Sequence, residues 1–425
     1  MGRKTDTRCR MREAPSEAPK GMNPFRGLIS FEDAKEMLLR NIRPISRVET
    51  VPLEEAHGRV SASDIVSPID VPPFERAAMD GFAVIASDTF HARHHAPRTL
   101  TLIEVIDVGS PPEKRISRGE CAQIVTGAPM PAGADAVVMA ENTEVSGTSV
   151  HVHAPVYPGE NVGKKGEDIK KGEVVVGSGS YLTPGRIGAC AAIGVTSLRV
   201  YEKPRIGVIP SGEEIVLPGK DLNPGEIYDV NSYTLSALIE MHGCSPVRYP
   251  AVRDHPREIM SAIQDALKRC DMVILSGGSS VGPKDLILDV LSRLGRVEFH
   301  GVAVKPGKPT LLAVVSDRVI LGMPGYPTSC LTNGYGFLVD ALRKLSRLPG
   351  YTPLRRTLPM GHRITSTTGR VQFLPVKIEN GMVYSVFKES GAITSMSKAD
   401  GYILIPASVD LIEKGDPVEV ILFES

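Results

Sequence analysis

The chain has 425 residues and equal numbers of basic and acidic residues, with 49 Lys and Arg against 49 Asp and Glu. This length exceeds one ordinary hydrophobic core and predicts two to four domains. Zero net charge disfavours a protein that neutralises a nucleic-acid backbone or an anionic membrane, and the lack of Trp leaves little material for base stacking. We therefore expect no nucleic-acid partner and no membrane partner.

The first 26 residues are basic and contain proline, without the apolar segment of a signal peptide. Their composition predicts a flexible arm. The six cysteines include no Cys-x-x-Cys pair, and most of them stand in or beside apolar runs. Reduced, buried thiols are the plain interpretation, which favours a cytoplasmic protein.

A helix is predicted at "SFEDAKEMLLRNI", because Ser30 and Asp33 resemble a capping box before an apolar stripe. Short β-type runs such as "TLIEVID" and "DAVVMAEN" then alternate with Gly and Pro clusters. This pattern predicts two mostly β domains threaded through each other. One consists of residues 71–150, and the other combines residues 27–70 with 151–202.

The pattern changes at residue 203. The runs "RIGVIPS", "PVRYPAV" and "DMVILS" indicate strands, and "NSYTLSALIEMHG" and "PREIMSAIQDALKRC" indicate amphipathic helices between them. Strands that alternate with helices over residues 203–350 predict a parallel sheet covered on both faces. Short alternating runs such as "VQFLPVKI" and "PVEVILF" predict a small β-barrel over residues 351–425.

The unusual residues of the α/β domain gather in the loops that we expect to follow its strands. These loops are "PSGEE", "RDHP", "SGGSSVGPKD", "KPGKP" and "GMPGYPTS". In an open α/β sheet, ligands bind outside the carboxyl ends of the strands. The five loops therefore predict one site at the carboxyl edge of the sheet.

Glycines, small hydroxyls and helix N-termini in these loops, as in Ser211 and Gly212, suit phosphate or another oxyanion. Glu213, Glu214, Asp254 and Asp285 add carboxylates, which would repel phosphate unless a divalent cation lies between them. Mg²⁺ fits, since it binds few carboxylates together with water and substrate oxygens. The combination predicts phosphoryl or nucleotidyl chemistry on a phosphorylated small molecule.

Each loop alone has a simpler interpretation. A Gly-Gly-Ser loop is also typical of a tight strand–helix turn, "KPGKP" of a turn with solvated lysines, and "MPGYP" of a rigid turn. Five such loops at one edge of a sheet favour a site. The histidines of "HARHH" and "HVH" have no partner cluster in the sequence, and we interpret them as surface residues.

Seven motifs occur in a fixed order along the chain. They are "AAMDGFAV", "VTGAPMPAGADAVVMAEN", "PSGEEIV", "SGGSSVGPKD", "KPGKP", "GMPGYPTS" and "SGAITSMSKADGYILIP". In this order they resemble the molybdopterin molybdenumtransferases of the MoeA type, which include the gephyrin E domain. The resemblance runs from about Leu28 to Phe423. It implies a multidomain α/β plus β fold with an α/β domain of the molybdopterin-binding type, two interleaved mostly β N-terminal domains and a C-terminal β-barrel.

The resemblance also implies a reaction. Adenylyl-molybdopterin is the substrate, molybdate or tungstate is inserted, and AMP is released with Mg²⁺. The family forms homodimers, in which residues 27–70 and 151–202 would serve as the linker and dimerisation domain. The sites lie between the α/β domain of one subunit and the β region of the other. The molybdopterin adenylyltransferase is a further partner that the resemblance suggests.

Site residues follow position by position from the same resemblance. Glu214, Asp254 and Asp285 match the acidic positions that bind Mg²⁺ or orient the attacking oxygen. Lys305 and Lys308 match basic positions that suit an oxyanion. The substrate cradle and the pocket wall are matched by Asp229, Asn231, Gly277, Gly278, Ser279, Ser280, Gly282, Pro324 and Pro327.

The second subunit is expected to contribute three residues of the β region. Glu75 and Thr126 match catalytic positions, and Asp80 of "MDG" matches a substrate-binding position. Three positions depart from the family pattern. Glu75 stands where the family commonly has Asp, Ser279 stands where it has Val, and Tyr326 stands where it often has Asn.

Two other functions stay open from the sequence. The α/β domain also resembles the molybdopterin adenylyltransferases, which share the Gly-Gly-Ser loop. A pterin-binding scaffold without turnover is the second alternative, and Glu75 and Tyr326 are the residues that suggest it. The "MDG" and "TGAP" motifs favour the molybdenumtransferase over the first alternative, and the complete acidic set disfavours the second.

Overall fold

A computed structural model describes residues 27–277 and 286–423 of the chain. The chain divides into two compact units. Unit 1 consists of Met1–Arg47 and Glu202–Ser425, and unit 2 consists of Val48–Tyr201. None of the helices in the described ranges combines the length and apolarity that a membrane span requires.

The α/β domain of unit 1 is built on a six-stranded sheet in the order β16-β13-β17-β21-β20-β18. Its strands are β13 (Arg205–Pro210), β16 (Ser245–Arg248), β17 (Met272–Ser276), β18 (Arg296–His300), β20 (Leu311–Val315) and β21 (Arg318–Met323). The short strands β14 (Ile215–Val216) and β15 (Ile227–Tyr228) pair separately. Strands β16, β13, β17 and β21 run parallel, as predicted.

Strand β20 corrects the prediction of a wholly parallel sheet, because it is antiparallel to both β21 and β18. Only Ser316 and Asp317 join β20 to β21, and both have positive φ angles of 49° and 61°. A two-residue link of this kind makes a tight hairpin and is far too short for the crossover that parallel strands need. The start of β20 therefore lies at the carboxyl edge of the parallel strands.

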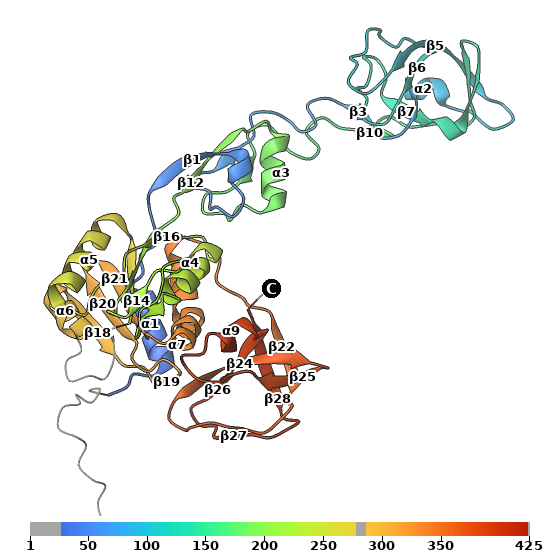
Figure 1. Ribbon diagram of the computed structural model, residues 1–425. Helices are drawn as coiled ribbons and strands as arrows, with labels where there is room; N and C mark the ends of the chain where they lie inside the picture. Colours follow the sequence, from blue (N-terminus) through green and yellow to red (C-terminus); the bar gives the residue numbers. More distant parts are fainter. Residues whose placement is uncertain (1–26, 278–285, 424–425) are drawn as a thin grey trace, which may run out of the picture. The chain divides into compact units, whose positions relative to one another are not determined.

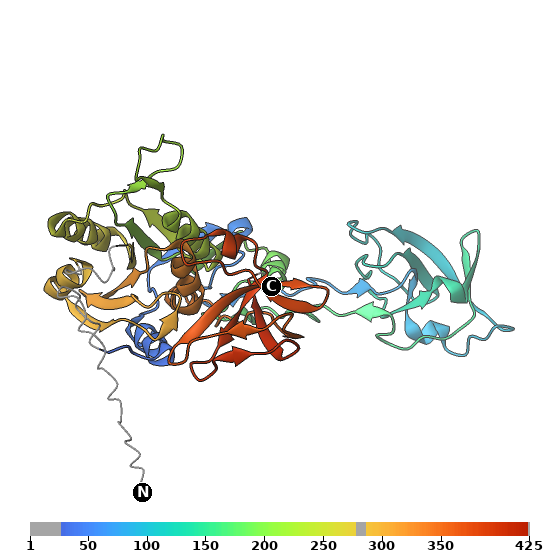
Figure 2. The same cartoon turned by 60° about the horizontal axis from the view of Figure 1, so that its bottom comes forward.

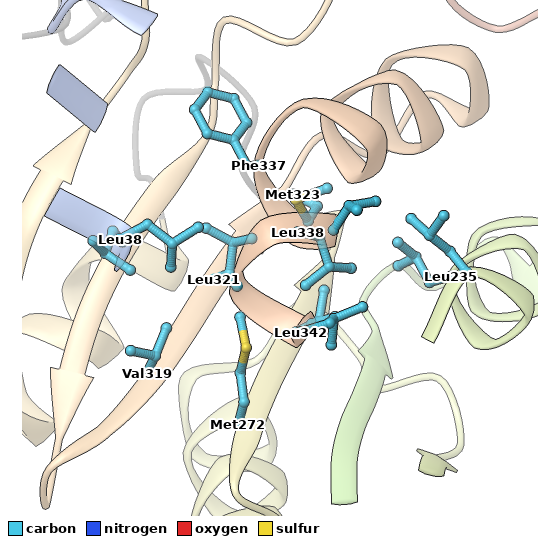
Figure 3. Close-up of a cluster of buried hydrophobic side chains, with 14 of the residues drawn as sticks. Leu38, Leu235, Met272, Val319, Leu321, Met323, Phe337, Leu338 and Leu342 are labelled. Carbon is cyan, nitrogen blue, oxygen red and sulfur yellow. The ribbon is translucent and has the colours of Figure 1, made fainter. Parts of the chain in front are cut away.

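Helices cover both faces of this sheet, as predicted (Figures 1 and 2). One face carries α1 (Phe31–Asn41), α4 (Asn231–Met241), α7 (Pro327–Asn333) and α8 (Val339–Leu345), and the other carries α5 (Pro256–Arg269) and α6 (Leu286–Leu294). Alternate residues of each strand serve the two cores, since Met272 packs in the first and Val273 in the second. Figure 3 shows Leu38, Leu235 and Phe337 from three helices meeting strand residues in the first core.

Helices α7 and α8 are joined by a π-helical segment, Gly334–Leu338, so that the helical backbone is continuous from Pro327 to Leu345. Its internal glycines have a packing reason. A Cβ at position 334 would lie 2.8 Å from Leu238 Cδ2, and one at position 336 would lie 2.7 Å from Phe373 Cζ. The glycines therefore let this helix approach α4 and the C-terminal strands closely.

The C-terminal region of unit 1 has a sheet in the order β19-β24-β26-β28-β22, with β25 beside β24. Its elements are β19 (Val304–Lys305), β22 (Arg355–Pro359), β24 (Val371–Glu379), β25 (Met382–Ser385), β26 (Gly401–Ile405), β28 (Pro417–Leu422), the pair β23 (Ile364–Thr365) and β27 (Leu411–Ile412), and helix α9 (Thr394–Ser397). Lys305 of β19 pairs with Gln372 of β24. The loop "KPGKP" therefore starts inside the C-terminal sheet.

Unit 2 is rich in β structure, as predicted, with a six-stranded sheet in the order β7-β4-β6-β5-β9-β8. Its strands are β1 (Val48–Pro52), β2 (Ile65–Val66), β3 (Arg76–Ala77), β4 (Gly81–Val84), β5 (Arg98–Ile106), β6 (Glu120–Ile124), β7 (Ala136–Met139), β8 (Thr143–Ser146), β9 (Ser149–Val152), β10 (Val162–Gly163), β11 (Val174–Val176) and β12 (Ser197–Tyr201). Its helices are η1 (Leu53–Glu55), α2 (Ala86–Thr89), η2 (Ala140–Asn142) and α3 (Pro184–Ala192). Strand β1 pairs with β12 and β2 with β11, so the first and last segments of this unit share one core.

Candidate functional site

The loops at the carboxyl edge of the α/β sheet are tied together by backbone hydrogen bonds. The Ser211 N–H donates to the Ser276 carbonyl at 2.8 Å, and the Gly212 N–H donates to the Val252 carbonyl at 3.1 Å. The Gly277 N–H donates to the Met323 carbonyl at 3.3 Å. The residues that follow β13, β17 and β21 thus meet at one place, together with the segment that precedes "RDHP".

Glycines make this meeting sterically feasible. Gly277 has φ +98°, and a Cβ there would run into the backbone carbonyl of Ser211. A Cβ at position 325 would lie 3.3 Å from the Gly277 Cα, so the loop "GMPGYPTS" backs directly onto the loop after β17. Gly277, which was predicted for the substrate cradle, is therefore also required for this close approach of the chain, together with Gly325.

Two of the three predicted acidic residues converge on Ser211 and Gly212. The Ser211 hydroxyl donates to Asp254 Oδ1 at 2.7 Å. The Glu214 carboxylate folds back over Gly212, where a Cβ would lie 2.7 Å from Glu214 Oε2. Both carboxylates belong to exposed residues and have the hard oxygen donors that Mg²⁺ prefers.

The predicted metal set cannot be assembled in full from these two residues. The residues that the structure describes contain no group of three or more His, Cys, Asp or Glu side chains that could hold a metal ion. The third carboxylate, Asp285, lies outside the described residues. So do four predicted members of the substrate cradle: Gly278, Ser279, Ser280 and Gly282.

The start of helix α4 supplies a second polar group to the same edge. Asp229 is buried, and its Oδ1 accepts a hydrogen bond from the Ser232 N–H at 3.0 Å, which caps the helix. The Asn231 Nδ2 donates to the Gly325 carbonyl at 2.8 Å. This amide therefore joins α4 to the loop "GMPGYPTS".

Three buried oxygens at this edge lack a hydrogen-bond partner among the described residues: Asn231 Oδ1, Ser232 Oγ and Ser276 Oγ. Buried polar atoms in folded proteins normally have partners, so these atoms suit a bound polar group. Neither Ser232 nor Ser276 was among the predicted site residues, although Ser276 begins the motif "SGGSSVGPKD". Ser276 is the last residue of β17, and that position directly before the glycines was the available signal.

The loop "KPGKP" reaches the carboxyl edge because it precedes the antiparallel strand β20. The Lys305 Nζ donates to Thr367 Oγ1 at 3.3 Å, and the Lys308 carbonyl accepts from the Val302 N–H at 3.0 Å. Gly307, between the two lysines, lies against the side chain of Asn333. The lysines therefore sit on a backbone segment that is fixed at several points.

The loop "GMPGYPTS" leads directly into helix α7. Pro324 is buried, and Pro327 is the first residue of the helix, where its fixed φ angle is favourable. Tyr326 between them is 67% exposed. The Thr328 N–H donates to the Ser390 carbonyl at 3.0 Å, which attaches the C-terminal region to this loop.

The predicted residues of unit 2 form a separate, exposed arrangement. One oxygen of Asp80, Oδ1, accepts from the Thr126 N–H at 2.6 Å and from the Thr126 hydroxyl at 2.7 Å. The backbone hydrogen bond, followed by that of the hydroxyl, holds the pKa of Asp80 below its ordinary value. The Glu75 carbonyl accepts from the Met130 N–H at 2.9 Å, which fixes the backbone of Glu75.

Three family models match consecutive parts of the chain. The MoeA N-terminal region (domains I and II) matches residues 29–194. The probable molybdopterin binding domain matches residues 207–344, and the MoeA C-terminal region (domain IV) matches residues 357–423. Together they leave few described residues unmatched.

Relatives of known name and solved structures agree with these models. The molybdopterin molybdenumtransferase of Haemophilus influenzae is 30% identical over 88% of this chain and 96% of its own length. Molybdopterin molybdenumtransferase 2 of Mycobacterium tuberculosis is 32% identical over 90% and 96%. The crystal structure of a molybdopterin biosynthesis MoeA protein from Pyrococcus horikoshii is 39% identical with a TM-score of 0.83, covering 94% of this chain and 100% of that one. The chain therefore belongs to the MoeA family of molybdopterin molybdenumtransferases.

Proposed function

We propose that this enzyme inserts molybdate or tungstate into adenylyl-molybdopterin and releases AMP in a Mg²⁺-dependent reaction of molybdenum cofactor biosynthesis. The observation that carries the proposal is the convergence on Ser211 and Gly212 of two carboxylates and of Gly277, the residue that follows β17. Carboxylates beside phosphate-binding loops are the combination that phosphoanhydride cleavage requires. The names of relatives at about 30% identity over nearly the whole chain support the same reaction.

The acidic residues would hold Mg²⁺. Glu214 and Asp254 fit this ion because their oxygens gather at one loop, and Asp285 would complete the set. When bound, the ion would supply positive charge to the phosphate oxygens of the phosphoanhydride whose cleavage releases AMP. The Ser211 hydroxyl holds Asp254 by its 2.7 Å hydrogen bond to Oδ1, and the other carboxylate oxygen would serve as the ligand of the ion.

The basic and amide groups would bind the substrates. Lys305 and Lys308 supply the charge for molybdate or phosphate, both of which are oxyanions. Asn231 and the buried hydroxyl of Ser276 would offer polar groups of the pterin substrate oxygen atoms that have no hydrogen-bond partner in the described part of the chain. The glycines after β17, with Asp229, would form the rest of the cradle, and Pro324 and Pro327 would shape its wall.

Homodimerisation is the second part of the proposal. Residues 48–70 and 151–202 would form the dimerisation domain, since the rest of the predicted segment 27–70 belongs to unit 1, where α1 packs in the core of the α/β domain. Residues 71–150 of a second copy would bring Glu75, Asp80 and Thr126 to the α/β domain at 203–350. Support comes from Asp80, which is exposed and whose pKa is lowered because one of its oxygens, Oδ1, accepts both hydrogen bonds from Thr126. We further propose a cytoplasmic location and delivery of substrate by a molybdopterin adenylyltransferase.

The test is AMP release from adenylyl-molybdopterin and Mg²⁺ with molybdate, with tungstate and with neither. Oxyanion-dependent release by the wild type, and its loss in Asp254→Ala, would support the proposal. Asp265→Ala is the matched control, because Asp265 is a carboxylate of helix α5 that pairs with Arg269. Tight binding without release would favour the scaffold alternative, and adenylyl transfer from a nucleotide would favour the adenylyltransferase alternative.

A further inference from the structure

We propose that Asn333 is a positioning residue that fixes the lysine loop, residues 305–309, and so sets where Lys305 and Lys308 meet the oxyanion. Asn333 is the last residue of helix α7 and lies outside every motif that the sequence singles out. The inference rests on the proposed function, because it assumes that these lysines bind molybdate or phosphate.

The contacts of Asn333 form a closed polar triangle. Its Nδ2 donates to the Gly307 carbonyl at 3.1 Å and to Thr310 Oγ1 at 2.6 Å. The Thr310 hydroxyl in turn donates to the Gly307 carbonyl at 2.8 Å. Asn333 and Thr310 have no exposed surface. Such a buried network specifies one arrangement of the loop, because breaking any bond leaves a polar atom without water or partner.

Shape reinforces these bonds. Gly307 has φ +109°, and a Cβ there would lie 2.7 Å from the Asn333 Cγ. The amide therefore packs on the Cα of the residue between the two lysines. On either side, Lys305 is paired in strand β19 and the Lys308 carbonyl is bonded to the Val302 N–H. Asn333 thus anchors the middle of a loop whose two ends are held by other elements.

Helix α7 joins this loop to another part of the candidate site. The helix begins at Pro327, directly after the exposed Tyr326, and ends at Asn333 against Gly307. One rigid element therefore fixes the distance between "GMPGYPTS" and "KPGKP". Lysine has a flexible four-carbon stem, so a backbone shift of its loop changes which oxyanion positions its ammonium reaches. Small displacements of binding groups have large effects on turnover.

An asparagine at this position also calls for a reason. Asn is unfavourable inside helices because its side chain competes for backbone hydrogen bonds, and burying it without partners is costly. Here the partners of its Nδ2 lie 26 and 23 residues earlier in the chain, in the lysine loop, whereas its Oδ1 has no hydrogen-bond partner among the described residues. Asn333 therefore stands at a helix position where its hydrogen bonds to the lysine loop offset its low helix propensity.

The test compares Asn333→Ala with Thr332→Val. Thr332 is the preceding residue of the same helix and is equally buried, and its hydroxyl bonds within the helix to the Thr328 carbonyl at 2.6 Å. Both variants remove one buried polar group from α7, but only the first touches the lysine loop. Thr310→Val should reproduce the effect of Asn333→Ala from the loop side, and Thr310→Ser, which keeps the hydroxyl, should restore it.

Two readouts are measured for each variant. Amide hydrogen exchange over residues 304–311 should become at least tenfold faster in Asn333→Ala and Thr310→Val, and should stay within twofold of wild type in Thr332→Val and Thr310→Ser. The molybdate concentration for half-maximal AMP release should rise at least tenfold in the first pair, with a smaller change in kcat, and should stay within twofold in the second pair.

The outcomes separate this inference from the proposed function. Equal exchange rates in Asn333→Ala and Thr332→Val would overturn the positioning role, whatever the enzyme does. Faster exchange with an unchanged half-saturating molybdate concentration would overturn its consequence for the oxyanion. Lys308→Ala tests the proposed function separately. An unchanged dependence of AMP release on molybdate concentration in that variant would overturn the proposal that Lys308 binds the oxyanion.

Discussion

The carboxyl edge of the α/β sheet and the Asp80–Thr126 pair of unit 2 hold their polar groups in opposite ways. At the carboxyl edge, loops from distant parts of the chain contact one another directly. Gly277 packs against the Ser211 backbone, and the Asn231 side-chain amide donates to the Gly325 carbonyl. Asp80 and Thr126 lie on exposed turns and are joined by two hydrogen bonds to a single oxygen.

Because of this difference, substitutions in the two regions should differ in how far they lower stability and how far they lower activity. A change at the carboxyl edge alters packing between loops, so it should lower both stability and activity. A change at Asp80 removes an exposed charge and leaves the hydrophobic cores of unit 2 intact. Exposed polar pairs contribute little to stability in general. The two regions should therefore respond to comparable substitutions in ways that calorimetry and enzyme assays can tell apart.

Gly277→Ala should give the largest loss of stability. The new Cβ meets the Ser211 carbonyl, in a backbone conformation of φ +98° that also disfavours alanine. We expect a loss of about 3 to 4 kcal/mol in the free energy of unfolding of the α/β domain. Differential scanning calorimetry and AMP release measured on the same sample would show both losses.

Gly219→Ala is the matched control for Gly277→Ala. Gly219 has a similar φ of +93°, but a Cβ there meets nothing within 4 Å. It should lose only about 1 kcal/mol, the usual cost of a left-handed conformation for alanine. Equal losses in the two variants would contradict the view that the loops touch at Gly277.

His242 tests whether a buried polar group far from the carboxyl edge behaves like those at the edge. It caps the other end of helix α4, is buried against Tyr351, and has no hydrogen-bond partner for either ring nitrogen among the described residues. Burial, with a contribution from Arg343, lowers its pKa to about 4 from the ordinary 6.5. The folded protein therefore keeps His242 neutral at a pH where the unfolded chain binds a proton.

The direction of the pH effect follows from this difference. The stability due to neutral His242 is fully present above pH 6.5 and is lost as the pH falls from 6.5 towards 4. At pH 5 the loss should be about 2 kcal/mol. Urea unfolding at pH 7.5 and pH 5 should show that His242→Leu loses less stability on acidification than the wild type does. An equal loss in both would mean that other groups cause the acid sensitivity.

The position of the site followed from the sequence, because alternating strands and helices place the loops after parallel strands at one edge. The hairpin between β20 and β21 did not follow, since apolar patterns carry no information on strand direction. Its signal was the short, polar Ser316–Asp317 link. It changes the account of "KPGKP", which precedes a strand where we expected it to follow one.

The partners of the site residues were out of reach of sequence reasoning. The contact of Ser211 with Asp254 spans 43 residues, and that of Asn333 with Gly307 spans 26. Spacing along the chain says nothing of such pairs unless one helix or one strand carries both members. The resemblance named Asp80 and Thr126 individually, but their direct hydrogen bonds appear only in the folded chain.

Asp80→Asn should have the smallest effect on stability and a large effect on turnover. The amide keeps the shape of the side chain and an oxygen for the Thr126 N–H, so unit 2 should melt as the wild type does. AMP release should fall at least tenfold, because the charge offered to the substrate is gone.

Asp64→Asn is the control, since Asp64 is also exposed in unit 2 and accepts a backbone hydrogen bond, from the Ser178 N–H at 2.7 Å. If Asp64→Asn reduced AMP release as much as Asp80→Asn did, the loss would reflect a general effect of charge on unit 2. If Asp80→Asn lowered the melting temperature as much as Gly277→Ala does, the contrast between a packed edge and an exposed pair would be wrong.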